Sequence, residues 1–139
     1  MNISARVANR LGEHTVHLRT EGREHSLTIP PKAEGLGSGT NGGELLFLAL
    51  ATCYCNDIYR EAGKRGIEVE RVQVEVTGEF GGPGEGARHI RYSASVDAKA
   101  PCDQIVALMR HTDTVAEIHN TLRQSSPVVF SECEVHEIP

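Results

Sequence analysis

The stretch that decides the fold is NGGELLFLALATCYCNDIYREAGK, residues 41–64. Asn41 and Glu44 have the spacing of a capping box, in which each side chain binds a free backbone amide of the first helical turn. Apolar side chains then cover most of the helix circumference for three turns, and Gly66 provides a stop signal. The pattern predicts a long helix that is buried on several sides.

Shorter segments on both sides of this helix predict antiparallel strands. Three segments before it alternate apolar and polar residues and are joined by tight turns: residues 3–8, 15–20 and 25–29. Two longer segments after it alternate in the same way: residues 67–80 and 90–98. Such alternation is typical of a sheet with one buried face and one face in water.

The last third of the chain predicts two short helices and a closing strand. One helix begins at Pro101, and a second begins at a capping box formed by Thr114 and Glu117. Residues 127–137 alternate and predict a final strand. The element order is then βββ-α-ββ-αα-β, which is an α+β fold with helices against antiparallel sheet. We expect a single domain over residues 1–139.

Composition excludes several classes of partner. The net charge is −5 with scattered basic residues, and there is no tryptophan, so neither nucleic acid nor an anionic membrane is expected. The first ten residues lack the apolar segment of a signal peptide. The longest apolar run, Leu45 to Ala51, is too short to span a bilayer. We therefore expect a cytoplasmic protein without a membrane segment.

The cysteines and histidines predict neither a metal site nor a disulfide. Four cysteines in a reducing cytosol favour free thiols, and their spacing matches no paired zinc-ligand pattern. Cys53 and Cys55 point about 200° apart on a helix, so they cannot share a metal ion. His119 lies on an apolar face and is expected to be a hydrogen-bonded core residue. The glycine-rich loop 32–43 lacks the known phosphate-binding patterns, so no cofactor is expected.

Each cysteine is therefore considered alone. Cys53 lies about three turns from the helix start, too far for the helix dipole to activate it, so a reactive Cys53 needs a cation from elsewhere. Cys102 lies in the first turn of its helix, where the dipole favours a thiolate. Cys133 alternates with Val129 and Val135, which predicts a core position.

A family resemblance rests on residues 39–80, GTNGGELLFLALATCYCNDIYREAGKRGIEVERVQVEVTGEF. This stretch resembles the OsmC/Ohr family of osmotically induced and organic-hydroperoxide-resistance proteins. The shared features are a glycine-rich loop, a TNPEELL-like helix start, a small-residue run ending in cysteine and a following strand. The resemblance implies an intertwined homodimer in which sheets from both chains wrap two central helices.

The resemblance also implies a peroxide-reactive cysteine, which falls on Cys53. Family members support this thiol with an arginine from the N-terminal strands and a glutamate at the start of the central helix. That glutamate falls on Gly43, so Glu44, one position later, is the candidate here. The arginine is taken as Arg19, and three alternatives stay open: Arg6, Arg10 and Arg23.

The chain also departs from the family at the second cysteine, which resolves the oxidised thiol. The matching segment runs from Ser125 to Val128 and has Ser126 in place of cysteine. Serine cannot form a disulfide with a sulfenic acid. The segment TDTVAEIHNTLR resembles a divergent OsmC-like branch instead.

Three hypotheses follow. The first is a peroxidase-like enzyme that reduces small hydroperoxides through Cys53 and is regenerated by an external thiol. The second is a non-enzymatic homodimer that binds a small apolar or thiol-bearing molecule near Cys53, or senses oxidation. The third is a structural protein without a ligand.

Overall fold

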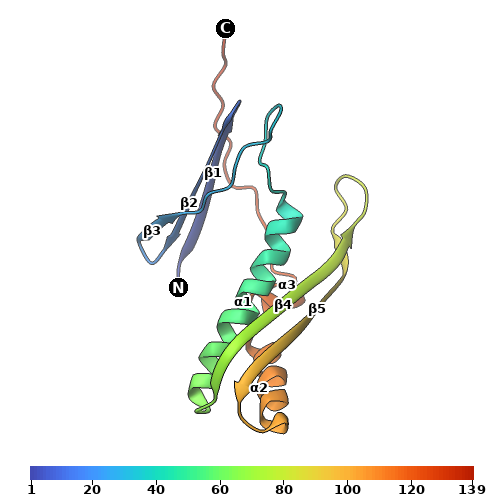
Figure 1. Cartoon of the computed structure of the whole chain (residues 1–139). Helices are drawn as coiled ribbons and strands as arrows, with labels where there is room; N and C mark the ends of the chain where they lie inside the picture. Colours follow the sequence, from blue (N-terminus) through green and yellow to red (C-terminus); the bar gives the residue numbers. More distant parts are fainter. The chain divides into compact units, whose positions relative to one another are not determined.

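The computed structural model describes residues 1–139 and contains five strands and three helices (Figure 1). The strands are β1 (Ile3–Arg10), β2 (Glu13–Thr20), β3 (Arg23–Ser26), β4 (Glu68–Phe80) and β5 (Ala87–Lys99). The helices are α1 (Gly42–Lys64), α2 (Cys102–Val115) and α3 (Glu117–Arg123). The structure is thus α+β with antiparallel sheets, as the sequence predicts. No helix combines the length and the apolar character that crossing a membrane requires.

The chain divides into two compact units. The first consists of Met1–Leu48 with Gly78–Ile90, and the second of Ala49–Thr77 with Arg91–Pro139. Helix α1 and the β4–β5 hairpin each contribute residues to both units. Each unit is described separately below.

The first unit contains a three-stranded antiparallel sheet in the order β1-β2-β3. Ile3 pairs with Thr20 at one end of the β1–β2 ladder. The turn into β3 uses Glu21 and Gly22, both with positive φ, which matches the right-handed twist of a hairpin. Strand β3 ends at Ser26, so the prediction that it reaches residue 29 is wrong.

Helix α1 begins and ends as the sequence predicts. The Asn41 backbone N–H donates to Glu44 Oε1 at 3.1 Å, and the Glu44 N–H donates to Asn41 Oδ1 at 2.8 Å. At the other end Gly66 has φ +65°, and the Ile67 N–H donates to the Ala62 carbonyl at 3.0 Å. This is the glycine-terminated bonding that satisfies the last carbonyls of a helix.

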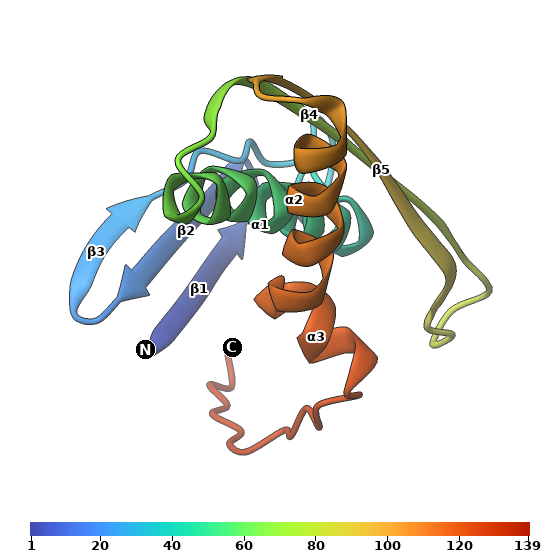
Figure 2. The same cartoon turned by 90° about the horizontal axis from the view of Figure 1, so that it is seen from below.

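The core of the second unit lies where α1 and α2 meet the β4–β5 hairpin (Figures 1 and 2). Four buried residues form its centre: Tyr54, Ile58, Ala62 and Leu108. Tyr54, Ile58 and Ala62 recur every four residues along α1, which is the spacing of one helix face, and Leu108 comes from α2. Alternate residues of β4, such as Val72 and Val74, pack against this face.

The predicted boundary between α2 and α3 is wrong. Helix α2 continues through Thr114, whose hydroxyl donates to the His111 carbonyl at 2.6 Å instead of capping the next helix. Helix α3 begins at Glu117, and its N-cap residue Ala116 offers no side-chain hydrogen bond. A threonine can bond back to the preceding turn, and this competes with the capping geometry.

The predicted closing strand over residues 127–137 is absent. This segment has no regular structure, and Val128 and Phe130 are 98% and 86% exposed. Cys133 is exposed as well, so its predicted core position is wrong in this chain. An alternating segment becomes a strand only when its backbone groups find a ladder partner, and this segment has none here.

Candidate functional site

The Cys53 thiol lies at the junction of two helices of the second unit. Its Sγ is 3.5 Å from Asp57 Oδ2, one turn further along α1, and 3.8 Å from Glu117 Oε2 at the start of α3. Asp57 is buried, Cys53 is partly exposed and Glu117 is exposed. The thiol is therefore reachable from solvent on one side and faces carboxyl groups on the other.

A single cation holds these carboxyl groups. Arg60 Nη1 is 2.9 Å from Asp57 Oδ1 and 2.9 Å from Glu117 Oε1. Its Nε atom is 2.9 Å from the buried carboxylate of Glu61. Arg60 thus binds one carboxylate oxygen of Asp57 and one of Glu117. The second oxygen of each carboxylate faces Cys53.

This arrangement disfavours the charged form of the thiol. Burial raises the pKa of Cys53, and the nearby charges of Asp57 and Glu117 raise it further, whereas a backbone hydrogen bond from Ile118 lowers it. Burial also raises the pKa of Asp57, with Glu117 adding to the rise. The pKa of Glu117 is lowered instead, by a hydrogen bond from its own backbone and by the contacts with Asp57 and Arg60.

The other predicted supporting residues have partners of their own. Glu44 closes the capping box with Asn41, nine residues before Cys53 on α1. Arg19 lies in β2 and forms an ion pair with Glu24 of β3. Roles for Glu44 and Arg19 at the thiol stay predictions.

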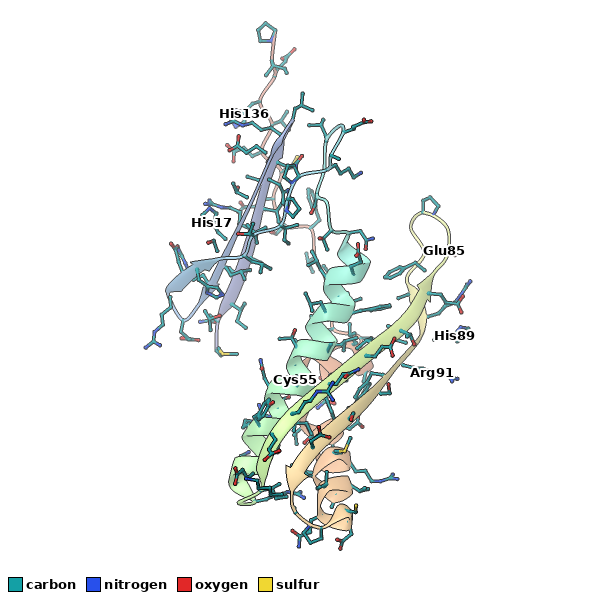
Figure 3. The ribbon with its side chains drawn as sticks, in the orientation of Figure 1. His17, Cys55, Glu85, His89, Arg91 and His136 are labelled. Carbon is teal, nitrogen blue, oxygen red and sulfur yellow. The ribbon has the colours of Figure 1, made fainter.

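The remaining cysteines lie apart from Cys53. Cys55, labelled in Figure 3, borders an open cavity of about 250 Å³ together with Val74 of β4. Cys102 is exposed at the start of α2, and Cys133 is exposed in the C-terminal segment. All four cysteines are free thiols in the structure, and no pair forms a disulfide.

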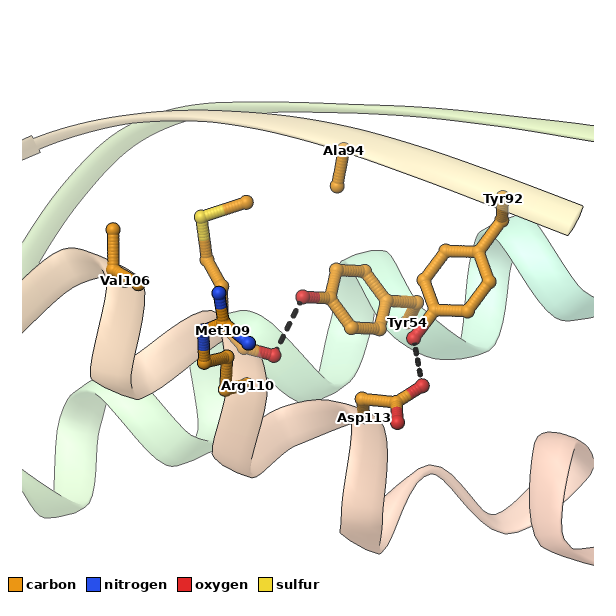
Figure 4. A pocket seen from close by; sticks show the side chains of 7 residues that line it. All are labelled: Tyr54, Tyr92, Ala94, Val106, Met109, Arg110 and Asp113. Carbon is orange, nitrogen blue, oxygen red and sulfur yellow. Dashed lines mark hydrogen bonds between the residues drawn. The ribbon is translucent and has the colours of Figure 1, made fainter.

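A larger cavity of about 590 Å³ lies between β5, α1 and α2 (Figure 4). Seven residues line it: Tyr54, Tyr92, Ala94, Val106, Met109, Arg110 and Asp113. The Tyr54 hydroxyl donates to the Met109 carbonyl at 2.8 Å, and the Tyr92 hydroxyl donates to Asp113. The cavity therefore joins an apolar surface to one acidic and one basic side chain.

His119 packs behind this tyrosine pair with both ring nitrogens buried and without a hydrogen-bond partner. Its ring lies 4.7 Å from that of Tyr92, edge to face, and is 4% exposed. Burial lowers the pKa of His119, and the nearby Arg123 lowers it further. The predicted burial of this histidine is confirmed, but the expected hydrogen bond is absent.

The carboxyl groups around Cys53 were not predicted from the sequence. Asp57 and Arg60 lie four and seven residues after Cys53, and this helical spacing could have indicated them. Glu117 is 64 residues away in the chain and reaches the thiol only because α3 folds back to α1. The sequence had suggested only a capping role for it.

Sequence comparison places the chain among known proteins. The family described as OsmC-like protein matches residues 35–131. YmaD, an uncharacterized protein of Bacillus subtilis strain 168, is 40% identical over 53 residues. These residues are 38% of this chain and only 35% of YmaD.

Solved structures share the fold. An OsmC-like protein from Mycoplasma pneumoniae superposes with a TM-score of 0.62 at 20% identity, over 88% of this chain and 89% of the other. A Vibrio cholerae protein named for organic hydroperoxide resistance has captopril bound in one of its active sites. It gives a TM-score of 0.54 at 22% identity, over 88% of this chain and 85% of the other.

Proposed function

Because the chain belongs to the OsmC-like protein family, we propose that it reduces organic hydroperoxides through Cys53 by a one-cysteine route. The observation that carries the proposal is the position of the thiol. Cys53 is partly exposed on α1, outside the buried core, and lies beside polar side chains that are held by Arg60. Organic hydroperoxides, after which some of the similar structures are named, can therefore reach the sulfur.

The reaction needs two steps. The thiolate attacks one peroxide oxygen, so that an S–O bond forms and the O–O bond breaks. The leaving alkoxide takes a proton, and the products are a cysteine sulfenic acid and an alcohol. Two external thiols then reduce the sulfenic acid to the thiol, which yields their disulfide and water. An external reductant is required because Ser126 stands where a resolving cysteine would be, and the proposed cytoplasmic setting is rich in thiols.

The environment of Cys53 makes this a slow peroxidase at neutral pH. Only the thiolate is nucleophilic, and burial together with the Asp57 and Glu117 charges raises the pKa of the thiol. We therefore expect peroxide consumption to quicken as the pH rises. This pH dependence distinguishes the proposed enzyme from one whose cysteine is already a thiolate at neutral pH.

The test is intact-protein mass spectrometry after one equivalent of cumene hydroperoxide with dimedone present as a sulfenic acid trap. We expect one dimedone adduct on Cys53 and loss of peroxide consumption in Cys53→Ser. Cys55→Ser is the matched control, because Cys55 is also partly exposed and on the same helix. An unmodified Cys53, with peroxide consumption equal in wild type and Cys53→Ser, disproves the proposal.

We further propose that the functional form is a homodimer. The support is the amount of apolar surface that the single chain leaves in water. On β1, Ile3 and Val7 are 65% and 59% exposed, and the C-terminal segment exposes Val128 and Phe130. Apolar residues exposed in such numbers indicate a surface that another chain covers.

A non-enzymatic alternative is favoured by the cavity of about 590 Å³ beside Tyr54. Its volume is in the range that holds a small organic molecule. In this alternative the protein binds a small, largely apolar or thiol-bearing ligand and does not turn it over. Native mass spectrometry of the purified protein distinguishes the two functions, because a bound ligand would add mass that Tyr92→Ala removes and Cys53→Ser keeps.

A further inference from the structure

The geometry around Cys53 points to a second use of the same three side chains. We propose that Cys53, Asp57 and Glu117 bind a zinc ion and that the bound zinc blocks reaction of the thiol with peroxide. The zinc site stands on the geometry alone, whereas its effect on peroxide reduction rests on the proposed function.

The first argument is the spacing of the three ligand atoms. Cys53 Sγ lies 3.5 Å from Asp57 Oδ2 and 3.8 Å from Glu117 Oε2, and all three atoms lie within 4.8 Å of one another. With Zn–S of about 2.3 Å and Zn–O of about 2.0 Å, the sulfur–oxygen edge of a tetrahedral zinc site is about 3.5 Å. The two sulfur–oxygen separations are therefore already close to those that zinc needs.

The second argument is the way in which the carboxyl groups are held. Arg60 binds Asp57 Oδ1 and Glu117 Oε1, and these are not the oxygens that face the thiol. The oxygens Oδ2 and Oε2 thus stay directed at Sγ while their partners are fixed from behind. Hydrogen bonds of this kind orient metal-ligating carboxylates in known sites.

The third argument is charge. A thiolate and two carboxylates carry three negative charges, and Arg60 supplies one positive charge. Zinc supplies the remaining two, so the cluster becomes neutral with all three ligands deprotonated. Three protein ligands leave a fourth position open, and Glu117 lies at the exposed side, where water can enter.

The proposal explains how zinc would control the thiol. A thiolate that shares its electron pair with zinc is a poorer nucleophile, so the peroxide oxygen gains no S–O bond while the metal is present. The other acidic group near the site, Glu61, pairs with Arg60, Lys64 and His111 and does not contact the three ligand atoms.

Cobalt titration of the full-length, chelator-treated protein tests the site, because cobalt replaces zinc and is coloured. We expect a thiolate-to-cobalt charge-transfer band at one equivalent, which one equivalent of zinc removes. Cys53→Ser should lose the band and Cys55→Ser should keep it. Glu117→Gln should weaken zinc binding at least about tenfold in competition with a coloured chelator. Because Glu117 is exposed, this variant tests the site without disturbing the core.

Three results would overturn the proposed zinc site. The wild type shows no band, the band survives in Cys53→Ser, or Glu117→Gln weakens zinc binding by less than this factor. Oxidation of Cys53 by one equivalent of cumene hydroperoxide, compared between metal-free and zinc-loaded protein, tests the regulation. We expect at least about tenfold slower oxidation with zinc, and equal rates overturn this part. If the metal-free protein is not oxidised at all, the peroxidase proposal fails while the cobalt spectra still decide the zinc site.

Discussion

Cys53 and Asp57 lie one turn apart on α1, and Cys53 Sγ donates a 3.5 Å hydrogen bond to Asp57 Oδ2. The acceptor is buried, so its charge is poorly screened and acts strongly on the sulfur. A thiol beside a buried carboxyl group resists deprotonation. Burial is the larger cause of the raised pKa of Cys53, and this contact with Asp57 adds to it.

Asp57→Asn should therefore activate the thiol. Removing the negative charge lowers the pKa of Cys53, because the Asp57 charge is one of the causes that raise it. In metal-free protein we expect alkylation of Cys53 by iodoacetamide at neutral pH to quicken about three- to tenfold. Peptide mass spectrometry over a pH series measures the rate for each cysteine, and Cys55 serves as the internal control. An unchanged midpoint of the Cys53 profile would show that the carboxyl group does not act on the thiol.

Arg60→Ala should destabilise the fold. Arg60 binds three carboxyl groups, and two of them, on Asp57 and Glu61, are buried. Asp57 then loses the cation that pairs with it, whereas Glu61 keeps Lys64, so the free energy of unfolding in urea should fall by about 1–3 kcal/mol. Arg71→Ala is the matched control, because its pair with Asp97 is exposed on both sides, and it should cost about 0.5 kcal/mol or less. Equal losses in the two variants would contradict the role of Arg60.

Gly43→Ala should also destabilise, although alanine usually favours a helix. A Cβ atom on Gly43 would lie 2.8 Å from Cε2 of Phe80, whose ring stacks on Phe47. We expect a loss of about 1 kcal/mol or more in urea unfolding from this overpacking, and a smaller loss when Phe80→Ala is also present.

Gly42→Ala is the matched control for this substitution. A Cβ atom on Gly42 meets nothing within 4 Å, so the control should be neutral or stabilising. If Gly43→Ala and Gly42→Ala behave alike, Phe80 is free to move and the explanation for Gly43 is wrong.

His119→Phe should fold normally. Its free energy of unfolding should fall less than that of wild type as the pH is lowered. Both ring nitrogens are buried without partners, and phenylalanine keeps the edge contact with Tyr92. The pKa of His119 is lower in the folded state than its ordinary value of 6.5. The unfolded chain therefore binds more protons as the pH falls below about 6.5, and wild type loses stability there.

Urea unfolding at pH 7.5 and at pH 5 measures this effect. The loss of stability between the two pH values should be smaller in His119→Phe than in wild type. His136→Phe is the control, because His136 lies in the C-terminal segment with an exposed side chain. Parallel curves, or a large loss of stability in His119→Phe at pH 7.5, would show that the nitrogens have partners in solution.

The sequence predicted those parts of the fold that local signals specify. The Asn41–Glu44 capping box and Gly66 fix α1 through contacts within a few residues, and alternation identified all five strands present. The Thr114–Glu117 box failed because a threonine hydroxyl can bond back as easily as forward. When a threonine can bond either to the preceding turn or to the next helix, only the packing around it decides which bond forms.

The candidate site was predictable only in part. Cys53 was identified through a family pattern. Asp57 and Arg60 follow it by four and seven residues, a spacing that places them on the same helix face. Glu117 could not be found, because its approach to Cys53 depends on how α3 packs on α1. The absence of partners for His119 is likewise a property of the packed core and has no signal in the chain.

The C-terminal segment provides the last prediction. Residues 127–137 alternate like a strand, yet in the single chain they are unpaired, and Phe130 is 86% exposed. If a second copy supplies the ladder partner, their amide protons should exchange within seconds at low protein concentration and far more slowly at high concentration. Hydrogen exchange with mass spectrometry measures this, and light scattering gives the mass of the particle.

Phe130→Asp should raise the protein concentration at which the dimer forms at least about tenfold, because a charge in an apolar interface costs about 1.4 kcal/mol or more. His136→Ala is the control from the same segment and should leave the mass unchanged. Fast exchange at every concentration, with a monomer mass throughout, would refute both the dimer and the strand.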